Sequence, residues 1–306
     1  MNTLIRPRKP LIAFVISLFL PGLGQLYNGS LNKASWFFMA FVFSSIVIAA
    51  AAALYLPPKW TVPVMLASAF LSAFIWVYSL LEATFDAKHK KQYQPFNWQG
   101  GGVYLLVFVA LFFVFLPLAS QYIKDHLVEA YRIPSASMEP TLVAGDFIFA
   151  DKRYNCPGCQ NKVERGDVVV FTYPNNRNTN YIKRIIGLPG DRVQINGETL
   201  KINGKTISKV IQQQDGMNVI EERNVDDRWI VIWKKIENKV KAPVYDIKVP
   251  PGHVFVLGDN RNASNDSRFF DTVPLADIKG KARQIWLSYN RKLGGLRMDR
   301  AGKFIQ

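Results

Sequence analysis

Two serines, separated by a single residue, lie between two prolines in the chain. The segment from Tyr131 to Lys152 reads YRIPSASMEPTLVAGDFIFADK, with Ser135 and Ser137 between Pro134 and Pro140. A proline fixes its own φ and moves the residue before it out of the helical region. We therefore expect a stiff, non-helical loop that leads into an apolar strand, which is a good place to present a nucleophile. An ordinary polar turn at the start of a strand is the alternative.

A serine nucleophile needs a base, and none of the three histidines has a promising setting. His89 lies in a predicted cytoplasmic loop, His126 lies next to a predicted membrane span, and His253 lies in a turn before an apolar strand. These positions disfavour a Ser-His-Asp triad.

Lys183 is the better candidate base because apolar side chains flank it in the segment NYIKRIIGLPGD. Neighbouring residues of a strand point to opposite faces, so Lys183 points inward with Ile185 if Arg184 points to solvent. Burial removes the hydration of an ammonium and lowers its pKa, which makes the neutral amine available near neutral pH. The alternative is a lysine whose stem covers apolar surface while its charge reaches the solvent.

A third polar segment follows an apolar strand and reads VFVLGDNRNASNDSR from Val254 to Arg268. Its many Asp, Asn, Ser and Arg side chains suit a loop that its own hydrogen bonds hold together. In such a loop Ser264 could orient a lysine amine, and Asp266 could pair with Arg268. A solvated turn is the alternative.

The chain after Gln121 alternates short apolar segments with Gly, Pro, Asn and Asp, which is typical of β-strands. Asn196-Gly197 and Asn203-Gly204 are turn signals for two hairpins. We expect one amphipathic helix at Tyr122–Ala130 and a polar inserted hairpin or lobe at Ser208–Lys241. The expected strands are Phe147–Ala150, Asp167–Thr172, Tyr181–Ile186, Arg192–Ile195, Thr199–Ile202, Trp229–Trp233, Val254–Leu257 and Arg283–Leu287.

The first 121 residues contain most of the long apolar segments. Ser35–Leu56, Val62–Ala83 and Gly101–Ser120 are each long enough to cross a bilayer, which takes about 20 mainly apolar residues. Leu11–Tyr27 is marginal and contains a Pro-Gly break, so it is either re-entrant or a fourth span. The sequence therefore predicts an N-terminal multi-span α-helical membrane region over 1–121. A mostly antiparallel β catalytic domain follows over 122–306.

Basic residues set the expected orientation in the membrane. Lys88, Lys90 and Lys91 lie between the second and third long spans, and the positive-inside rule places that loop in the cytoplasm. The span at 101–120 then delivers the β domain to the extracytoplasmic side. The basic N-terminus is also inside if Leu11–Tyr27 enters the membrane and returns, which we favour over a fourth span.

The net charge of +15 is compatible with binding to nucleic acid or to anionic lipid. The basic residues are scattered and form no stripe with interleaved aromatic residues. A basic domain beside anionic lipid therefore explains the charge more simply, and we expect no nucleic-acid partner.

The two cysteines, Cys156 and Cys159, form a CPGC sequence in a polar loop. Two cysteines and three histidines are a poor set for a four-ligand zinc site, so we expect no metal and no cofactor. A redox-active CxxC is typical of a helix N-terminus in a βαβ unit. A local disulfide is the better interpretation if the loop faces an oxidising compartment.

Together these segments resemble the type I signal peptidases (leader peptidases), the membrane-bound Ser/Lys proteases that remove signal peptides. PSASMEPTL resembles the nucleophile motif of that family, NYIKRIIGLPGD the general-base motif, and GDNRNASNDSR the third conserved block. RGDVVVF at Arg165–Phe171 matches the intervening block, which lies between the nucleophile motif and the general-base motif. The resemblance extends from about Glu129 to Trp286, and it implies the signal-peptidase type of fold for the β domain.

The resemblance implies that Ser137 attacks the scissile carbonyl and that Lys183 is the general base. It assigns the oxyanion hole to the Ser137 backbone N–H and the Ser135 hydroxyl. It also implies that Ser264 holds the Lys183 amine, and that Asp266 supports the third loop by its ion pair with Arg268.

The resemblance further implies shallow pockets for small side chains, and therefore cleavage after Ala-X-Ala. The substrate would bind as an added strand. The residues expected to contact it are Ile133, Pro134, Met138, Tyr181 and Ile182. The implied partners are preprotein signal peptides and the lipid bilayer, near the secretion translocon. The implied location is the bacterial inner (cytoplasmic) membrane, as a multi-pass protein with its catalytic domain on the periplasmic side.

Two features depart from the family pattern. Asn262-Ala263 stands where many members have Asp-Asn, and the membrane region is longer than the usual one or two spans. One alternative function is a specialised protease of the same clan that processes pilus or conjugation proteins. The other is a membrane protein that binds signal peptides without cleaving them, which would have no need to keep Ser137, Lys183 and Ser264.

Overall fold

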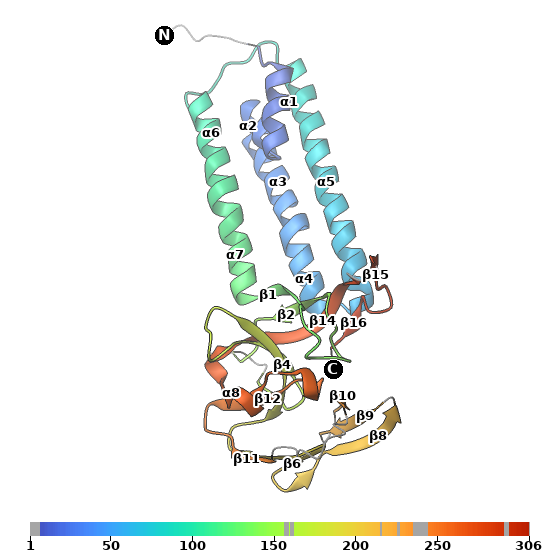
Figure 1. Cartoon of the computed structure of the whole chain (residues 1–306). Helices are drawn as coiled ribbons and strands as arrows, with labels where there is room; N and C mark the ends of the chain where they lie inside the picture. The colour runs from blue at the N-terminus through green and yellow to red at the C-terminus, as the bar shows by residue number, and fades with distance from the viewer. Residues whose placement is uncertain are drawn as a thin grey trace. The chain divides into compact units, whose positions relative to one another are not determined.

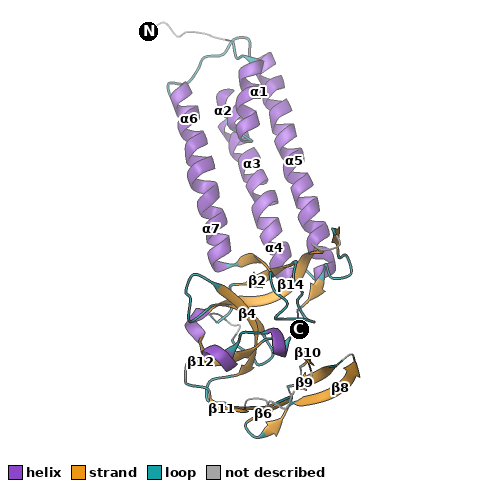
Figure 2. Ribbon diagram, in the orientation of Figure 1, coloured by secondary structure: helices purple, strands orange, loops and turns teal. Residues whose placement is uncertain are grey.

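The computed structural model describes residues 7–155, 159, 162–214, 216–224, 227–234, 244–290 and 294–305. The chain divides into two compact units, Met1–Asp125 and His126–Gln306. Helices make up the first unit, and strands make up most of the second (Figures 1 and 2). The predicted fold class, apolar helices followed by a mostly antiparallel β domain, is confirmed.

Three helical stretches in the described part of the chain are long and apolar enough to cross a membrane: Leu31–Tyr55, Pro58–His89 and Gly101–His126. A π-helical stretch interrupts the first and the third of them. Their elements are α3 (Leu31–Val42), η1 (Phe43–Val47), α4 (Ile48–Tyr55), α5 (Pro58–His89), α6 (Gly101–Val109), η2 (Ala110–Phe115) and α7 (Leu116–His126).

The first apolar segment turns back on itself within the helical unit. It forms α1 (Pro10–Phe19) and the short α2 (Leu23–Tyr27). The Lys9 backbone N–H donates to the Tyr27 hydroxyl at 3.1 Å, so the start of α1 meets the end of α2. Gly22 makes the turn with φ of 99°, where a Cβ would come within 2.5 Å of a backbone carbonyl oxygen. Both ends of the segment therefore lie at the same end of the unit.

The second unit is built on a nine-stranded sheet in the order β1-β2-β14-β3-β4-β12-β13, with β15 and β16 both paired to β14. All pairings between named strands are antiparallel. The strands of this sheet are β1 (Val128–Arg132), β2 (Asp146–Asp151), β3 (Val168–Thr172), β4 (Asn180–Gly187), β12 (His253–Leu257), β13 (Val273–Pro274), β14 (Ile278–Asn290), β15 (Gly295–Leu296) and β16 (Lys303–Phe304).

Two smaller sheets complete the unit. One has the order β11-β5-β6-β7 and the other has the order β10-β9-β8. Their strands are β5 (Arg192–Asn196), β6 (Thr199–Ile202), β7 (Lys205–Thr206), β8 (Ser208–Gln214), β9 (Met217–Arg223), β10 (Arg228–Lys234) and β11 (Val244–Lys248). The short helical elements are η3 (Arg261–Ala263), α8 (Ser267–Phe270) and η4 (Leu275–Asp277).

The two hairpin signals of the sequence are confirmed. Asn203 and Gly204 join β6 to β7 with φ of 50° and 81°. A two-residue turn with positive φ at both residues matches the right-handed twist of the strands on either side. Gly197, with φ of 56°, opens the turn between β5 and β6.

The expected helix at Tyr122–Ala130 is wrong in its second half. The helix α7 ends at His126, and Val128–Arg132 forms β1 along the edge of β2. Local propensity favoured continuation of the helix, but pairing with a strand that follows later in the chain decides the conformation. The segment Ser208–Lys241 was predicted as a polar insert, but it also contributes to the apolar core. Its residues Trp229 and Val231 are buried in a cluster that includes residues of β12.

Alternate residues of β3 belong to two different buried clusters. Val168 and Val170 pack with one cluster, and Val169 and Phe171 pack with the other. Side chains of a strand alternate between faces, so both faces of the sheet are covered at β3. The neighbouring β4, which carries the candidate base, is likewise buried from Lys183 to Gly187.

Candidate active site

The loop that carries Ser137 is fixed at both of its ends. The Ile133 N–H donates to the Asp146 carbonyl at 2.8 Å, and the Leu142 N–H donates to the Met138 carbonyl at 2.8 Å. Ile133, Met138 and Leu142 all belong to one buried apolar cluster beneath the loop. The loop that carries Ser137 therefore rests on a well-packed apolar cluster, and Ser137 itself is 8% exposed.

Lys183 reaches Ser137 from β4. Its Nζ lies 2.8 Å from Ser137 Oγ and 3.0 Å from the Ile182 carbonyl oxygen, and the residue is 3% exposed. Burial lowers the pKa of the Lys183 ammonium to about 8, while the charges of Asp266 and Asp259 oppose that decrease. Once the ammonium loses its proton, the same short contact lets the serine hydroxyl donate to the amine. A hydroxyl beside a buried amine is an arrangement suited to nucleophilic catalysis.

The condition on which the inward direction of Lys183 was argued, an Arg184 that points to solvent, is not met. Arg184 is fully buried, and its guanidinium donates to both carboxylate oxygens of Asp259, with Nε at 2.9 Å and Nη2 at 2.7 Å. Its Nη1 donates to the Gly166 carbonyl at 2.7 Å. Both faces of β4 are therefore enclosed at this point. The local sequence does not reveal this burial, because the partner carboxylate lies 75 residues away in the chain.

The third polar segment forms a compact loop around Asp266. This carboxylate lies 2.8 Å from Arg268 Nε and also accepts from the Gly258 N–H at 3.0 Å. Asp266 is fully buried and is the N-cap of α8. The Arg268 guanidinium also donates to the Arg261 carbonyl. One buried carboxylate thus joins the end of β12 to the start of α8.

Ser264 is placed beside the nucleophile loop, but it is not joined to the lysine by a hydrogen bond. It is 6% exposed, and its Oγ has no hydrogen-bond partner in the described part of the chain. A Cβ added to Gly258 would come within 2.2 Å of Ser264 Oγ and 2.5 Å of the Ser137 carbonyl oxygen. These three residues are therefore in close contact, and the lysine-orienting role of Ser264 stays a prediction.

The other predicted site residues occupy two environments. Ser135 is exposed and donates to Ser137 Oγ at 3.3 Å. Pro134 is exposed, whereas Tyr181 and Ile182 are half-buried on β4. Ile133 and Met138 are only 2% and 0% exposed, so neither presents an accessible side chain to a substrate here. Their contact with a substrate stays a prediction.

The predicted disulfide involves residues that are only partly described. Cys159 takes part in a disulfide. Cys156, its expected partner, lies outside the described residues.

Two residues that the sequence reasoning did not single out hold the nucleophile loop against the third loop. Asn260 donates from its N–H to the Ser137 carbonyl at 3.1 Å and from Nδ2 to the Ala136 carbonyl at 3.2 Å. Asp259 accepts from the Thr141 hydroxyl as well as from Arg184. In the sequence, the one feature that could have pointed to this role is the position of the Asp-Asn pair just after a buried strand.

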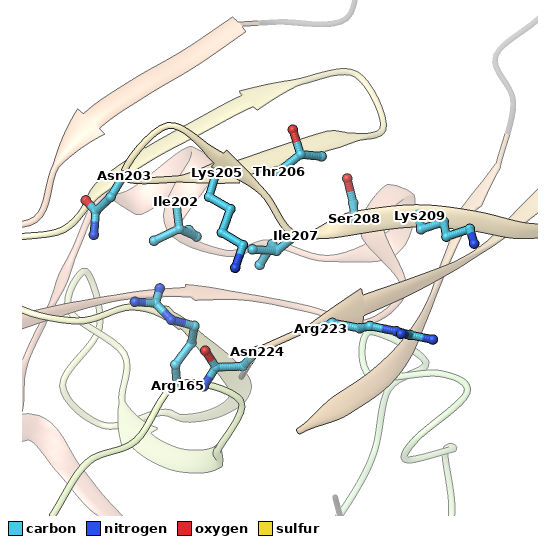
Figure 3. Close-up of a pocket in the computed structure, with 10 residues that line it drawn as sticks. All are labelled: Arg165, Ile202, Asn203, Lys205, Thr206, Ile207, Ser208, Lys209, Arg223 and Asn224. Atoms are coloured by element: carbon cyan, nitrogen blue, oxygen red, sulfur yellow. The ribbon is translucent and has the colours of Figure 1, made fainter. Parts of the chain in front are cut away.

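A pocket of about 760 Å³ lies elsewhere in the β domain (Figure 3). Side chains of four basic residues line it: Arg165, Lys205, Lys209 and Arg223. Neither Ser137 nor Lys183 is among its lining residues. Within the described ranges, no three His, Cys, Asp or Glu residues are grouped so that they could hold a metal ion.

Comparisons with known proteins identify the family of the chain. Residues 104–287 match the sequence model of the family described as signal peptidase, peptidase S26. Signal peptidase I of Pseudomonas fluorescens is 38% identical over 199 residues, which cover 55% of this chain and 67% of that protein. Signal peptidase I of Aquifex aeolicus is 34% identical over 218 residues, which cover 59% of this chain and 83% of the relative.

A crystal structure of a signal peptidase I from Enterococcus faecalis V583 is 31% identical, and the match covers 40% of this chain and 97% of that one. Its TM-score is 0.27, so the assignment rests on the sequence matches and not on this superposition. Together, the family match and the two bacterial relatives show that the chain belongs to the signal peptidase family S26.

Proposed function

We propose that this chain is a membrane-bound serine endopeptidase that removes signal peptides from exported preproteins by means of a Ser137–Lys183 dyad. The observation that carries the proposal is the 2.8 Å contact between Lys183 Nζ and Ser137 Oγ, made by a lysine that is 3% exposed. The relatives are signal peptidases by name, which supports the same substrate class for this chain.

In the proposed mechanism the neutral Lys183 amine takes the proton of the Ser137 hydroxyl as Oγ attacks the scissile carbonyl. The resulting ammonium then protonates the leaving amine. The amine next takes a proton from the water that attacks the acyl-enzyme. The ammonium then returns that proton to Ser137 Oγ as the acyl–oxygen bond breaks, which releases the product and restores both the serine and the neutral amine. With a pKa of about 8, roughly a tenth of the lysine is neutral at pH 7.

The oxyanion that forms on the scissile carbonyl would accept from the Ser137 N–H and the Ser135 hydroxyl. Each such donor lowers the barrier by about 3–4 kcal/mol in comparable sites. The Ser135 hydroxyl is 3.3 Å from Ser137 Oγ, which is close enough to turn to an oxygen bound at the nucleophile.

The substrate would bind as an extended strand along the first half of β4. The strand β12 pairs with β4 only from Arg184 to Gly187. Over Asn180–Lys183, among the described residues, only β3 pairs with β4, on its other edge. A free edge next to the base favours a peptide added to the sheet, with small side chains before the cut, as in Ala-X-Ala.

The proposal includes the location. The three apolar helices and the basic loop between the second and third of them favour a multi-pass protein of the bacterial inner membrane. The β domain would then face the periplasm, where signal peptides emerge from the secretion translocon.

The test is cleavage of a model preprotein by the detergent-solubilised full chain. Wild type is compared with Ser137→Ala, with Lys183→Ala and with Lys201→Ala, an exposed lysine of β6 that serves as a matched control. We expect cleavage after a small-X-small site by wild type and the control, and none by the other two variants. Wild-type rates in either dyad variant would refute the dyad, and no cleavage by the wild type would refute the function.

A further inference from the structure

The three-stranded sheet β8–β10 is joined directly to the loop that supports the nucleophile. The Ile232 N–H of β10 donates to the Asp259 carbonyl at 2.9 Å, and Ile232 forms a parallel bridge with Asn260. Asn260 in turn donates twice to the nucleophile loop, to Ser137 and to Ala136. Backbone hydrogen bonds therefore lead from β10 to Ser137 through the single peptide group that joins Asp259 and Asn260.

A buried ion pair strengthens the same junction. Arg261 Nη2 lies 2.5 Å from Glu222 Oε1 of β9, and the two side chains are 2% and 0% exposed. The second oxygen of Glu222 accepts from Trp229 Nε1 at 2.8 Å, and Arg261 Nε donates to the Gly258 carbonyl at 3.1 Å. Removal of one member of such a pair leaves an uncompensated charge in the interior, which the surrounding loop must move to solvate.

The residues next to Arg261 lie against the nucleophile loop and its neighbour Gly258. Asn260 precedes it, and Ser264, three residues later, lies in close contact with Gly258. A shift of Arg261 toward solvent would displace Asn260, and with it the carbonyl of Ser137. Displacement of a reacting group by an ångström can reduce a rate by about a hundredfold.

We propose that Glu222 is a positioning residue for the reaction and that the strands β8–β10 are part of the catalytic scaffold. Glu222 acts through Arg261 and Asn260 and does not touch the substrate. The inference rests on the proposed function, since it concerns how the Ser137 hydroxyl is held for attack. The inference assigns a role in the reaction to the segment Ser208–Lys241, which the sequence pattern predicts only as a polar insert.

The experiment uses four variants of the full chain in detergent: Glu222→Gln, Arg261→Met, the double variant, and Glu221→Gln. Glu221 is the matched control, because it directly precedes Glu222 in β9 and pairs with Arg223, which is largely exposed and outside the third loop. Each variant is assayed for kcat and KM with a model preprotein, at a temperature where circular dichroism shows it to be folded. Hydrogen–deuterium exchange of residues 258–268 is measured in parallel.

We expect Glu222→Gln and Arg261→Met to lower kcat about tenfold or more with little change in KM. The double variant should recover most of kcat, because no buried charge is left unpaired. The control should match the wild type. Exchange in 258–268 should rise in the single variants and return in the double variant.

Two results overturn the inference. One is a wild-type kcat in folded Glu222→Gln, with any effect confined to thermal stability, since a purely structural role predicts that outcome. The other is unchanged exchange of 258–268 in Glu222→Gln. Failure of the wild type to cleave refutes the proposed function instead, and in that case the exchange result alone decides whether β9 holds the loop.

Discussion

Replacement of Lys183 by methionine should stabilise the folded β domain at neutral pH, although it removes the proposed base. Lys183 is 3% exposed, and its burial lowers the pKa of the ammonium from 10.5 to about 8. At about 1.4 kcal/mol per pKa unit, the folded protein holds the charged form at a cost of about 3 kcal/mol. Methionine has a similar length and no charge to desolvate, so the variant avoids this cost.

The sign of the pH dependence follows from the direction of the pKa change. The folded pKa lies below the unfolded one, so the unfolded chain binds more protons between about pH 8 and pH 10.5. The free energy of unfolding of the wild type therefore gains about 3 kcal/mol from this group across that window, and the variant lacks the gain. The advantage of Lys183→Met should be full below pH 8, where it corresponds to about 6–12 °C in Tm, and should disappear by pH 10.5.

The assay is thermal unfolding of the detergent-solubilised chain, followed by circular dichroism in the β region from pH 7 to pH 10.5. Comparison of the two proteins at each pH cancels the other titrating groups. Lys201→Met, which removes an exposed lysine of β6, should show no such pH-dependent difference. A Lys183→Met variant that is less stable than wild type at pH 7, or a difference that does not change with pH, would refute the buried-ammonium argument.

The remaining predictions concern the rate profile, the third loop, the buried ion pair and the CPGC segment. The wild-type kcat/KM should rise with pH up to a pKa near 8, and a flat profile from pH 6 to pH 9 would exclude a lysine base with this pKa. Gly258→Ala should abolish cleavage in a folded protein, because the new Cβ would come within 2.2 Å of Ser264 Oγ; normal activity would contradict this. Arg184→Met should lower the free energy of unfolding in denaturant by about 3–5 kcal/mol, and Arg184→Met with Asp259→Leu should recover part of it. Cys156→Ser should leave kcat/KM largely unchanged, and an inactive variant would assign that loop a role in the reaction.

The order of elements could be predicted because its signals are local. The apolar helices follow from hydropathy, and the hairpins follow from Asn-Gly pairs, in which Asn203, Gly204 and Gly197 adopt the positive φ that favours a tight turn. The inward direction expected for Lys183 follows from apolar neighbours on a strand, and the structure brings it to Ser137. These inferences use information contained within a few residues.

The parts that sequence reasoning missed depend on contacts between distant segments. A solvent-facing Arg184 was only a condition in the argument for Lys183, and the structure buries Arg184 against the carboxylate of Asp259, which compensates its charge. The helix expected to continue to Ala130 ends because β2 offers an edge for pairing. The link from Glu222 to Arg261 likewise joins strands whose approach the sequence pattern does not reveal.

The pairing of β4 with β3 sets Lys183 opposite Val169 and Arg184 opposite Val168. Two cations therefore stand side by side, and only the alternation of the strand decides which of them meets the serine. A guanidinium stays charged throughout the physiological range, so a slip of one residue would leave the hydroxyl without a proton acceptor. The chemistry therefore depends on strand register: extra residues in the connection at 173–179 lengthen a loop, whereas the loss of one residue between Asn180 and Lys183 would place Arg184 opposite Val169, in the position of Lys183, and remove the base.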